Sequence, residues 1–243
     1  VAQAGGAPLP VTHLFLSDEE VGSPTSRELI EEMARAAKYV LVTEPAREGG
    51  KIVTGRKGVM RYELVMEGRA AHAGSRHADG INAIAELSRI MLAFDGLTDY
   101  QRGITCNVGM VEGGTGVNVV PARAFCAIDV RVPDAAAAAE VESFVATLRP
   151  QHAEAKLTVS GGLNRPAYER TEAIDTLFEH ARGLAAEIGF KLEDLTTGGG
   201  SDGNFTAPIA PTLDGLGVAG QAGHTEHAHL YVSSLEPRRD LLR

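Results

Sequence analysis

In the stretch RYELVME at residues 61–67, the apolar residues Tyr62, Leu64 and Met66 alternate with the charged residues Arg61, Glu63 and Glu67, and Val65 interrupts the charged face. Its apolar members Tyr62, Leu64 and Met66 fall on one side of an extended chain, because successive side chains of a strand point to opposite faces. A strand with one apolar and one charged face is typical of an antiparallel sheet that buries a single face. The stretch therefore predicts a half-exposed antiparallel strand.

The segments that follow extend this strand into a recognisable order of elements. The sequence predicts a helix near residues 80–94, strands near 104–111 and 123–132, a helix near 134–148 and a strand near 156–160. Strand, helix, strand, strand, helix, strand is the order of the split βαβ, ferredoxin-like pattern. We therefore expect a small α+β domain over residues 56–165.

The segment before this domain has a different pattern. Residues 11–16 (VTHLFL) and 39–43 (YVLVT) are continuous apolar runs, as in strands that are buried on both faces. Between them, Ser23 and Pro24 predict the start of a helix. A strand, a helix and a strand at this spacing predict a parallel sheet.

The same pattern resumes after residue 166, with a helix predicted over residues 171–188 and a strand near 191–196. We therefore predict an α/β domain made of residues 1–55 and 166–243, into which the α+β domain is inserted. In parallel sheets ligands bind at the carboxyl ends of the strands. The polar loops that follow the predicted strands are thus the candidates for a functional site.

Composition excludes several classes of protein. The 243 residues are 44% hydrophobic and 23% charged, which is ordinary for a globular chain, and no apolar run approaches the ~20 residues of a membrane span. The net charge of −9 argues against binding to nucleic acid or to anionic membranes. Two cysteines, Cys106 and Cys126, do not make a disulfide scaffold, so a reducing compartment and a cytoplasmic location are expected.

Four clusters carry metal-binding or catalytic residue types. They are Asp18-Glu19-Glu20, Glu44, GGGSDG at residues 198–203 and GHTEHAH at residues 223–229. Zinc takes histidine nitrogen and carboxylate oxygen, and a hydrolytic site leaves one position for water. Since Glu19 and Glu20 are adjacent, one can ligate a metal while the other accepts a proton from water.

The ordered motifs resemble those of one known family. They are SDEEVGS (17–23), VLVTEP (40–45), GRAAHAG (68–74), EGGTGVNVVP (112–121), DVRVP (129–133), GGGSDG (198–203) and GHT (223–225). Their order and spacing resemble the co-catalytic zinc carboxypeptidase, aminoacylase and deacetylase family, and its glutamate carboxypeptidase branch most of all. The resemblance implies an α/β, parallel-sheet zinc-hydrolase (phosphorylase/hydrolase-like) catalytic domain with an inserted ferredoxin-like lid that forms a homodimer.

The resemblance also implies a role for individual residues. Glu19 matches the general base, and Glu20, Glu44 and His224 match metal ligands. Two zinc ions per subunit are implied, and cobalt or manganese would also suit carboxylate-rich ligands. His72 matches a lid histidine that reaches the neighbouring subunit's site and stabilises an oxyanion, as an imidazole donor can.

The implied substrate is a small peptide or an N-acyl amino acid with a free carboxylate. Asn118 and Arg131 match lid groups that hold this carboxylate, and a guanidinium suits the role because it binds carboxylates with two parallel hydrogen bonds. The alternative for Arg131 is a surface ion pair with Asp129. Gly199 and Gly200 match a loop whose bare backbone approaches the substrate.

The sequence also departs from the family pattern. The first zinc ligand of the family lies in a His-x-Asp motif before the acidic loop, and a bridging aspartate follows it. The 17 residues before Asp18 contain no His-x-Asp. We therefore expect a fragment that lacks the N-terminal part of the catalytic domain and is inactive or impaired by itself, and we expect His227 and His229 at the surface.

Two alternatives compete with this hypothesis. GGSDG at residues 199–203 fits the G-x-S-x-G nucleophile elbow, and Ser201, Asp214 and His224 follow the order of a serine-hydrolase triad. That interpretation leaves the acidic loop, Glu44 and His72 without a role. The second alternative is a non-catalytic fragment whose lid still dimerises.

Overall fold

The computed structural model describes residues 10–243. Its internal contacts divide the chain into two compact units. One spans Lys57–Ala167, and the other combines the chain up to Arg56 with the chain from Tyr168 onward. The predicted domains, residues 1–55 with 166–243 and residues 56–165, stay a proposal, and residues 1–9 lie outside the described part.

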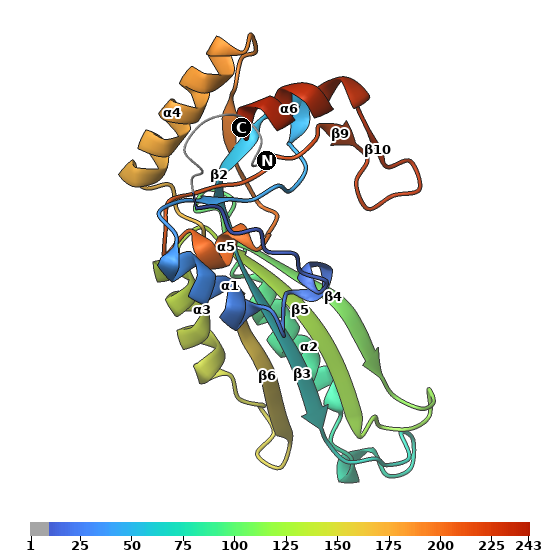
Figure 1. Ribbon diagram of the computed structural model, residues 1–243. Coiled ribbons are helices and arrows are strands. Elements are labelled where there is room, and N and C mark those ends of the chain that lie inside the picture. Colours follow the sequence, from blue (N-terminus) through green and yellow to red (C-terminus); the bar gives the residue numbers. More distant parts are fainter. Residues whose placement is uncertain (1–9) are drawn as a thin grey trace. The chain divides into compact units, whose positions relative to one another are not determined.

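The unit 57–167 is a four-stranded antiparallel sheet with two helices, in the strand order β4-β5-β3-β6. Its elements are β3 (Gly58–Glu67), η3 (His77–Asp79), α2 (Ala83–Asp95), β4 (Thr105–Gly113), β5 (Arg123–Val132), α3 (Ala135–Thr147) and β6 (Lys156–Arg165). This is the predicted β-α-β-β-α-β order. Figure 1 shows the four strands side by side, with β4 and β6 at the edges.

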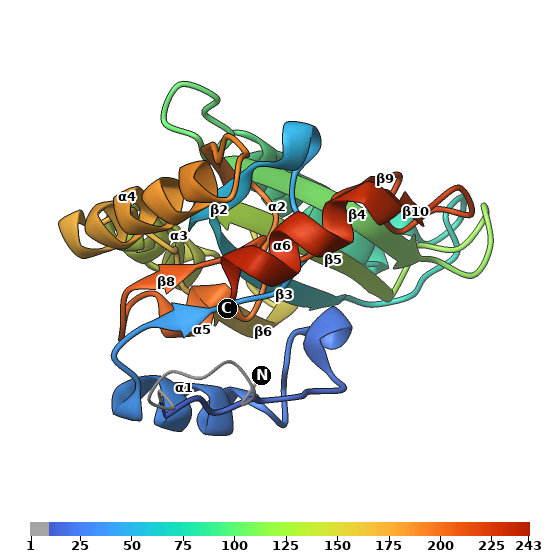
Figure 2. The same ribbon diagram turned by 45° about the horizontal axis from the view of Figure 1, so that its top comes forward.

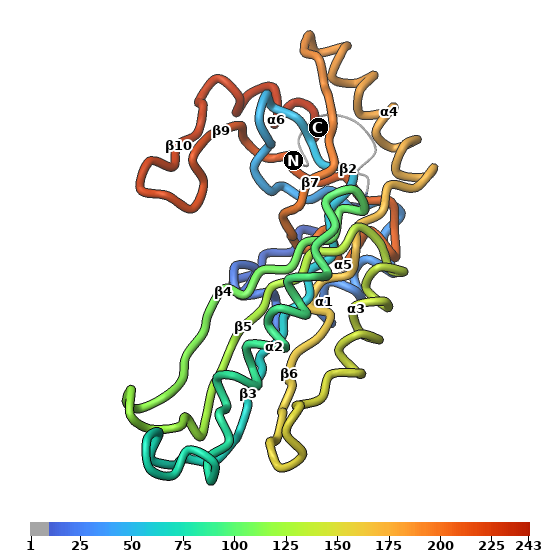
Figure 3. Tube along the Cα trace, turned by 180° about the vertical axis from the view of Figure 1, so that it is seen from behind, coloured from blue at the N-terminus to red at the C-terminus, as the bar shows by residue number. Residues whose placement is uncertain are grey.

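The alternating face of β3 forms the centre of this unit. Tyr62, Leu64 and Met66 are buried, as predicted, and pack in one apolar cluster with residues of α2 and α3 such as Phe94 and Val141. Figure 3 shows both helices on the same face of the sheet. Burial of this face against two helices accounts for the stability of the sheet, since burying each large apolar side chain contributes ~1.5–3 kcal/mol.

Polar side chains mark where both helices begin. Asn82 Oδ1 accepts a hydrogen bond from Ala85 N at 2.9 Å, and Asp134 Oδ1 accepts one from Ala137 N at 2.7 Å. Such N-caps satisfy backbone donors that have no partner within the helix. Helix α2 therefore begins at Ala83 rather than at the predicted residue 80.

The described residues of the other unit, 10–56 and 168–243, form short ladders and four α-helices. Strand β1 (Val40–Leu41) pairs in parallel with β8 (Thr212–Leu213), β2 (Ile52–Arg56) pairs in parallel with β7 (Asp194–Thr197), and β9 (Gly220–Gln221) pairs antiparallel with β10 (His229–Leu230). Its helical elements are η1 (Glu19–Val21), α1 (Arg27–Ala36), η2 (Glu48–Gly50), α4 (Glu172–Glu187), α5 (Gly203–Thr206), η4 (Val232–Ser234) and α6 (Leu235–Leu241). Figure 2 shows β1 beside β8.

The core of this unit lies between β2, β8 and α4. Ile52, Leu213, Ile174 and Phe178 are buried there in one apolar cluster. Thr171 caps the start of α4, which agrees with the predicted helix over residues 171–188. Within residues 10–243, no helix has both the length and the apolar content needed to cross a bilayer.

The predicted strand at residues 11–16 is wrong. These residues form no ladder, and Phe15 is 89% exposed. An apolar run becomes a buried strand only where a neighbouring strand pairs with it and another layer covers it. Within the described chain β1 pairs with β8 alone, so the predicted parallel sheet is reduced here to two-stranded ladders.

The start of the first helix also differs from the prediction. Helix α1 begins at Arg27, and Ser23 has a left-handed φ of 55°, which a helix cannot continue through. The intervening residues Thr25 and Ser26 instead hydrogen-bond back to Asp18. The turn around Ser23 therefore belongs to the acidic loop.

Candidate active site

The acidic loop is held in shape by Asp18. Its carboxylate accepts hydrogen bonds from Thr25 N at 2.9 Å, Thr25 Oγ1 at 2.7 Å, Ser26 N at 3.2 Å and Ser26 Oγ at 2.5 Å. The bond from the Ser26 hydroxyl makes the largest contribution to lowering the pKa of Asp18 to about 2. Asp18 thus anchors the loop, and the next two residues, Glu19 and Glu20, lie on η1, where neither is buried.

Two of the three predicted metal ligands are neighbours. His224 Nδ1 lies 3.9 Å from Glu20 Oε2, and their side chains are 81% and 78% exposed. The third, Glu44, has a raised pKa, first because of burial and then because of the negative charge of Asp214, while Arg56 and Arg47 oppose the shift and Glu20 adds to it. Glu44 is thus within electrostatic range of Glu20.

The described residues nevertheless do not form a metal centre. Among residues 10–243, no three histidine, cysteine or acidic side chains converge as they would on a metal ion. The donor types suit zinc, since two carboxylates and one imidazole are common ligands. In this structure Glu20, Glu44 and His224 do not lie in the arrangement of a ligand set.

The glycine loop at residues 198–203 rests on a buried ion pair. Arg56 Nε lies 2.7 Å from Asp214 Oδ2, and neither side chain is exposed to solvent. Arg56 Nη1 donates to Gly199 O at 2.9 Å and, in a longer contact, to Gly200 O at 3.4 Å. Sequence reasoning missed Arg56, although an arginine that ends the apolar strand KIVTGR was a signal for a buried partner.

The serine-hydrolase hypothesis is wrong. Ser201 Oγ donates directly to Asp214 Oδ2, and both side chains are buried. In a catalytic triad a histidine stands between the serine and the acid and takes the serine's proton. Here His224 is exposed beside Glu20, so Ser201 has a structural role next to Asp214.

The acidic loop and the glycine loop are joined to each other. Ser23 Oγ donates to Asp202 Oδ1 at 2.5 Å. Ser23 is fully buried and has the left-handed backbone described above. The loop that carries Glu19 and Glu20 is therefore tied to the loop that carries Gly199 and Gly200.

The unit 57–167 brings two predicted site residues together. His72 pairs with Val119 in an isolated bridge, and Ala73 N donates to Asn118 O at 2.9 Å. His72 Nδ1 accepts hydrogen bonds from Gly74 N and Ser75 N, both at 3.1 Å. Because Nδ1 accepts, the neutral ring carries its proton on Nε2, which makes Nε2 a donor.

The same unit places Asn118 and Arg131 of one copy at opposite ends of the sheet. Arg131 is opposite Thr105 near one end of the sheet, whereas the loop of Asn118 follows Gly113, which is opposite Ala124 at the other end. From residue 124 to residue 131 a strand extends about 23 Å. Arg131 Nε lies 2.6 Å from Asp129 Oδ1, the ion pair considered as its alternative.

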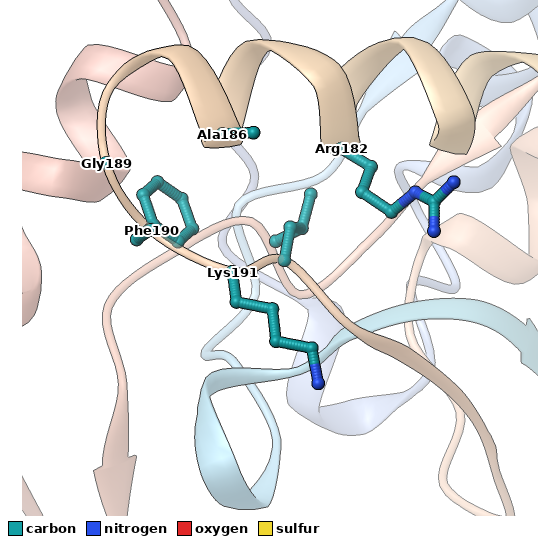
Figure 4. Close-up of a pocket in the computed structure, with 6 residues that line it drawn as sticks. Arg182, Ala186, Gly189, Phe190 and Lys191 are labelled. Atoms are coloured by element: carbon teal, nitrogen blue, oxygen red, sulfur yellow. The ribbon is translucent and has the colours of Figure 1, made fainter.

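One pocket lies away from all these residues. It has a volume of about 390 Å³ and is lined by Arg182, Ala186, Gly189, Phe190, Lys191 and Leu192. Figure 4 shows that Arg182 and Ala186 come from α4, while Phe190 and Lys191 follow in the turn after it. Its two cations pair with Glu179 and Glu193 in exposed ion pairs.

Comparison with known proteins identifies the class. A family model described as the M20 peptidase dimerisation domain matches residues 54–156. Carboxypeptidase G2 of Pseudomonas sp. (strain RS-16) is 33% identical over 236 residues, which cover 94% of this chain and 56% of the relative. Succinyl-diaminopimelate desuccinylase of Burkholderia multivorans is 29% identical over 248 residues, which cover 96% of this chain and 64% of that relative.

A solved structure agrees in fold. The YXEP protein of Bacillus subtilis, a dinuclear metal-binding peptidase of the M20 family, matches with a TM-score of 0.66 at 18% identity, covering 92% of this chain and 60% of that one. The chain is thus similar to M20 peptidases over nearly its whole length, and residues 54–156 match their dimerisation domain. It spans 56% and 64% of the length of the two curated relatives.

Proposed function

We propose that this chain is part of a metal-dependent hydrolase that cleaves an amide or peptide bond next to a free carboxylate. Similarity to carboxypeptidase G2 and to the M20 peptidase dimerisation domain supports the reaction class. The observation that carries the proposal is the distance of 3.9 Å between His224 Nδ1 and Glu20 Oε2. It places a residue from the C-terminal part of the chain next to the acidic loop that contains Glu19. The proposed substrate class includes the substrates of carboxypeptidases, dipeptidases, deacylases and desuccinylases.

In this proposal the acidic loop performs the proton transfer. Glu19 takes a proton from the attacking water and returns it to the leaving amine, a task that suits a carboxylate within reach of the water. Glu20, Glu44 and His224 are the proposed metal ligands. Zinc, when bound, would polarise the scissile carbonyl and activate water, and cobalt or manganese could replace it.

The lid residues serve substrate binding from two copies of the chain. His72 Nε2 is a donor beside Asn118, so both can reach one ligand, whereas Arg131 lies at the other end of the sheet. We therefore propose a homodimer in which His72 and Asn118 complete the partner's site. Arg131 contributes to a different site from the one that His72 and Asn118 of the same copy complete. Gly199 and Gly200 line the substrate-binding site.

Metal content and hydrolysis test the proposal together. Elemental analysis and assays with N-acyl amino acids and dipeptides would be run on the 243-residue chain and on the complete gene product. We expect the complete gene product to bind zinc and to lose activity with a chelator, and Glu19→Gln to lower kcat at least ~100-fold. Glu226→Gln, an exposed change beside His227, is the matched control.

Two results would count against parts of this proposal. Full activity of the Glu19→Gln variant would exclude Glu19 as the general base. Two tightly bound zinc ions with turnover in the 243-residue chain alone would overturn the expectation of an impaired fragment.

A non-catalytic dimerising chain is the second candidate. It is favoured by one observation, the lack of a three-ligand cluster among residues 10–243. A dimer by sedimentation, without metal and without turnover in the complete gene product, would select it. A strict monomer at high concentration would contradict dimerisation through the lid.

A further inference from the structure

Helix α6 carries a buried arginine. Arg238 is only 6% exposed. Its Nη2 donates a hydrogen bond to Gly50 O, and its Cζ lies 5.9 Å from the centre of the Phe190 ring. Its Nη1 is buried and has no hydrogen-bond partner among residues 10–243. Arg238 is thus enclosed by the chain, with part of its hydrogen-bonding capacity unused.

No described carboxylate balances the charge of Arg238. The next residue, Arg239, pairs with two carboxylates, whereas Arg238 forms no ion pair within residues 10–243. Residues 1–9 contain no acidic side chain. Burial lowers the pKa of Arg238. A guanidinium nevertheless stays protonated, and a buried charge is costly unless an opposite charge compensates it. This points to a counterion that a ligand supplies.

The aromatic ring beside Arg238 also lines the pocket that follows α4. The apolar lining consists of Ala186, Phe190 and Leu192, and the charged lining consists of Arg182 and Lys191. Figure 4 shows the Lys191 side chain extending away from the Phe190 ring. With about 390 Å³, the pocket is within the size range of sites that hold small organic molecules. It therefore offers an apolar wall together with two cations.

The carboxylates near the pocket do not hold these cations firmly. Arg182 pairs with Glu179 and Lys191 pairs with Glu193, and all four side chains are exposed. The hydrogen bond from Lys191 is the main cause of the lowered pKa of Glu193, and the charge of Lys51 adds to the shift, so a further cation lies nearby. Exposed ion pairs contribute little to stability. A ligand carboxylate can therefore compete with Glu179 and Glu193.

We propose that the pocket after α4 binds a small organic anion with an aromatic ring and one carboxylate. The ring packs against Phe190 and Leu192, and the carboxylate contacts Arg182 and Lys191. Arg238 does not touch the ligand. Its charge stabilises the carboxylate from the interior, where a low dielectric strengthens the attraction between charges. This site is separate from the proposed metal ligands and does not depend on the proposed function.

Titration with a simple probe tests the site. The 243-residue chain would be labelled with ¹⁵N and titrated with 3-phenylpropionate, and the control ligand is the uncharged 3-phenylpropionamide. The measurement is the shift of the backbone amide signals of Phe190, Lys191 and Leu192. We expect these signals to shift with the carboxylate, and we expect the amide to bind at least about tenfold more weakly.

Variants of two adjacent arginines test the role of the buried charge. Arg238→Met keeps an unbranched side chain without the charge, and Arg239→Met makes the same change at an exposed position of α6. We expect Arg238→Met to bind 3-phenylpropionate at least about tenfold more weakly, and Arg239→Met to bind it like the wild type. Lys191→Gln removes a cation at the ligand and should also weaken binding of the carboxylate.

The possible results are distinct. Equal binding of the carboxylate and the amide, or no shift of the three signals, would overturn the anion site. Unchanged binding by Arg238→Met would refute the role of the buried charge, and Lys191→Gln answers for the site even if Arg238→Met does not fold. Arg131→Ala should leave the response unchanged, because Arg131 belongs to the unit 57–167. Loss of the response in Arg131→Ala would mean that the probe acts through the proposed substrate site, and would overturn the inference.

Discussion

Arg56 Nε lies 2.7 Å from Asp214 Oδ2 in the interior of its unit, where water reaches neither group. Asp214 also accepts hydrogen bonds from the Ser201 hydroxyl and the Gly215 N–H. One carboxylate thus joins the end of β2, the glycine loop and the end of β8. Removing it would leave a buried cation and two buried donors without an acceptor.

Asp214→Ala should therefore be strongly destabilising. We expect a loss of about 3–5 kcal/mol in the free energy of unfolding, because one partner of a buried ion pair is left uncompensated. Urea unfolding followed by circular dichroism measures it. The double variant Arg56→Met with Asp214→Leu should lose less than Asp214→Ala, and a larger loss in the double variant would contradict this account.

Tyr62→Phe should leave stability unchanged or raise it by up to about 1 kcal/mol. The Tyr62 hydroxyl is buried and without a hydrogen-bond partner among residues 10–243, and burial raises its pKa to about 12. Tyr168→Phe is the matched change, since the Tyr168 hydroxyl donates to Thr212 O. Thermal unfolding should rank Tyr168→Phe below Tyr62→Phe, and the opposite order would refute the assignment of the two hydroxyls.

The fold of the unit 57–167 was predictable because its signals are local. Alternation along residues 61–67 identifies the central strand, and Asn82 and Asp134 mark two helix starts. The other unit depends on contacts between distant residues. Arg56 and Asp214 are 158 positions apart, and no local pattern pairs them. The apolar run at residues 11–16 does not show whether a neighbouring strand is present to pair with it, and a buried strand depends on such a neighbour.

The candidate site was predictable in type and not in arrangement. Motif matching identified His72, Asn118 and Arg131 as lid groups, but motif order gives spacing along the chain only. Strand β5 carries the chain from the Asn118 end of the sheet to the Arg131 end, so residues close in sequence lie far apart. The topology of the sheet, and not the identity of the residues, decides which of them can share a ligand.

The acidic loop should lose stability in a defined range of pH. Folding lowers the pKa of Asp18 from 3.8 to about 2, so its stabilising effect is complete above the unfolded-state value and is lost as the pH falls through the folded-state value. The difference in Tm between wild type and Asp18→Asn should be constant at neutral pH and shrink between about pH 4 and pH 2. Glu226→Gln is an exposed control, and a difference that persists below pH 2 would contradict the assigned cause.

Complementation between inactive variants would test the two-copy site. If Arg131 of one copy and His72 of the partner serve the same site, His72→Ala and Arg131→Ala should each lose activity in the complete gene product. Co-expressed in equal amounts, they should recover about a quarter of wild-type activity, because about half of the dimers are mixed and each mixed dimer has one intact site. The measurement is the specific activity of the purified mixture.

The matched control for this experiment follows from the structure. His72 and Asn118 lie on paired segments at one end of the sheet, so both belong to the same contributed surface. A mixture of His72→Ala and Asn118→Ala therefore places a defect in every site and should recover nothing. Recovery in both mixtures would mean that His72 and Asn118 serve different sites, and recovery in neither would mean that Arg131 does not share a site with the partner's lid residues.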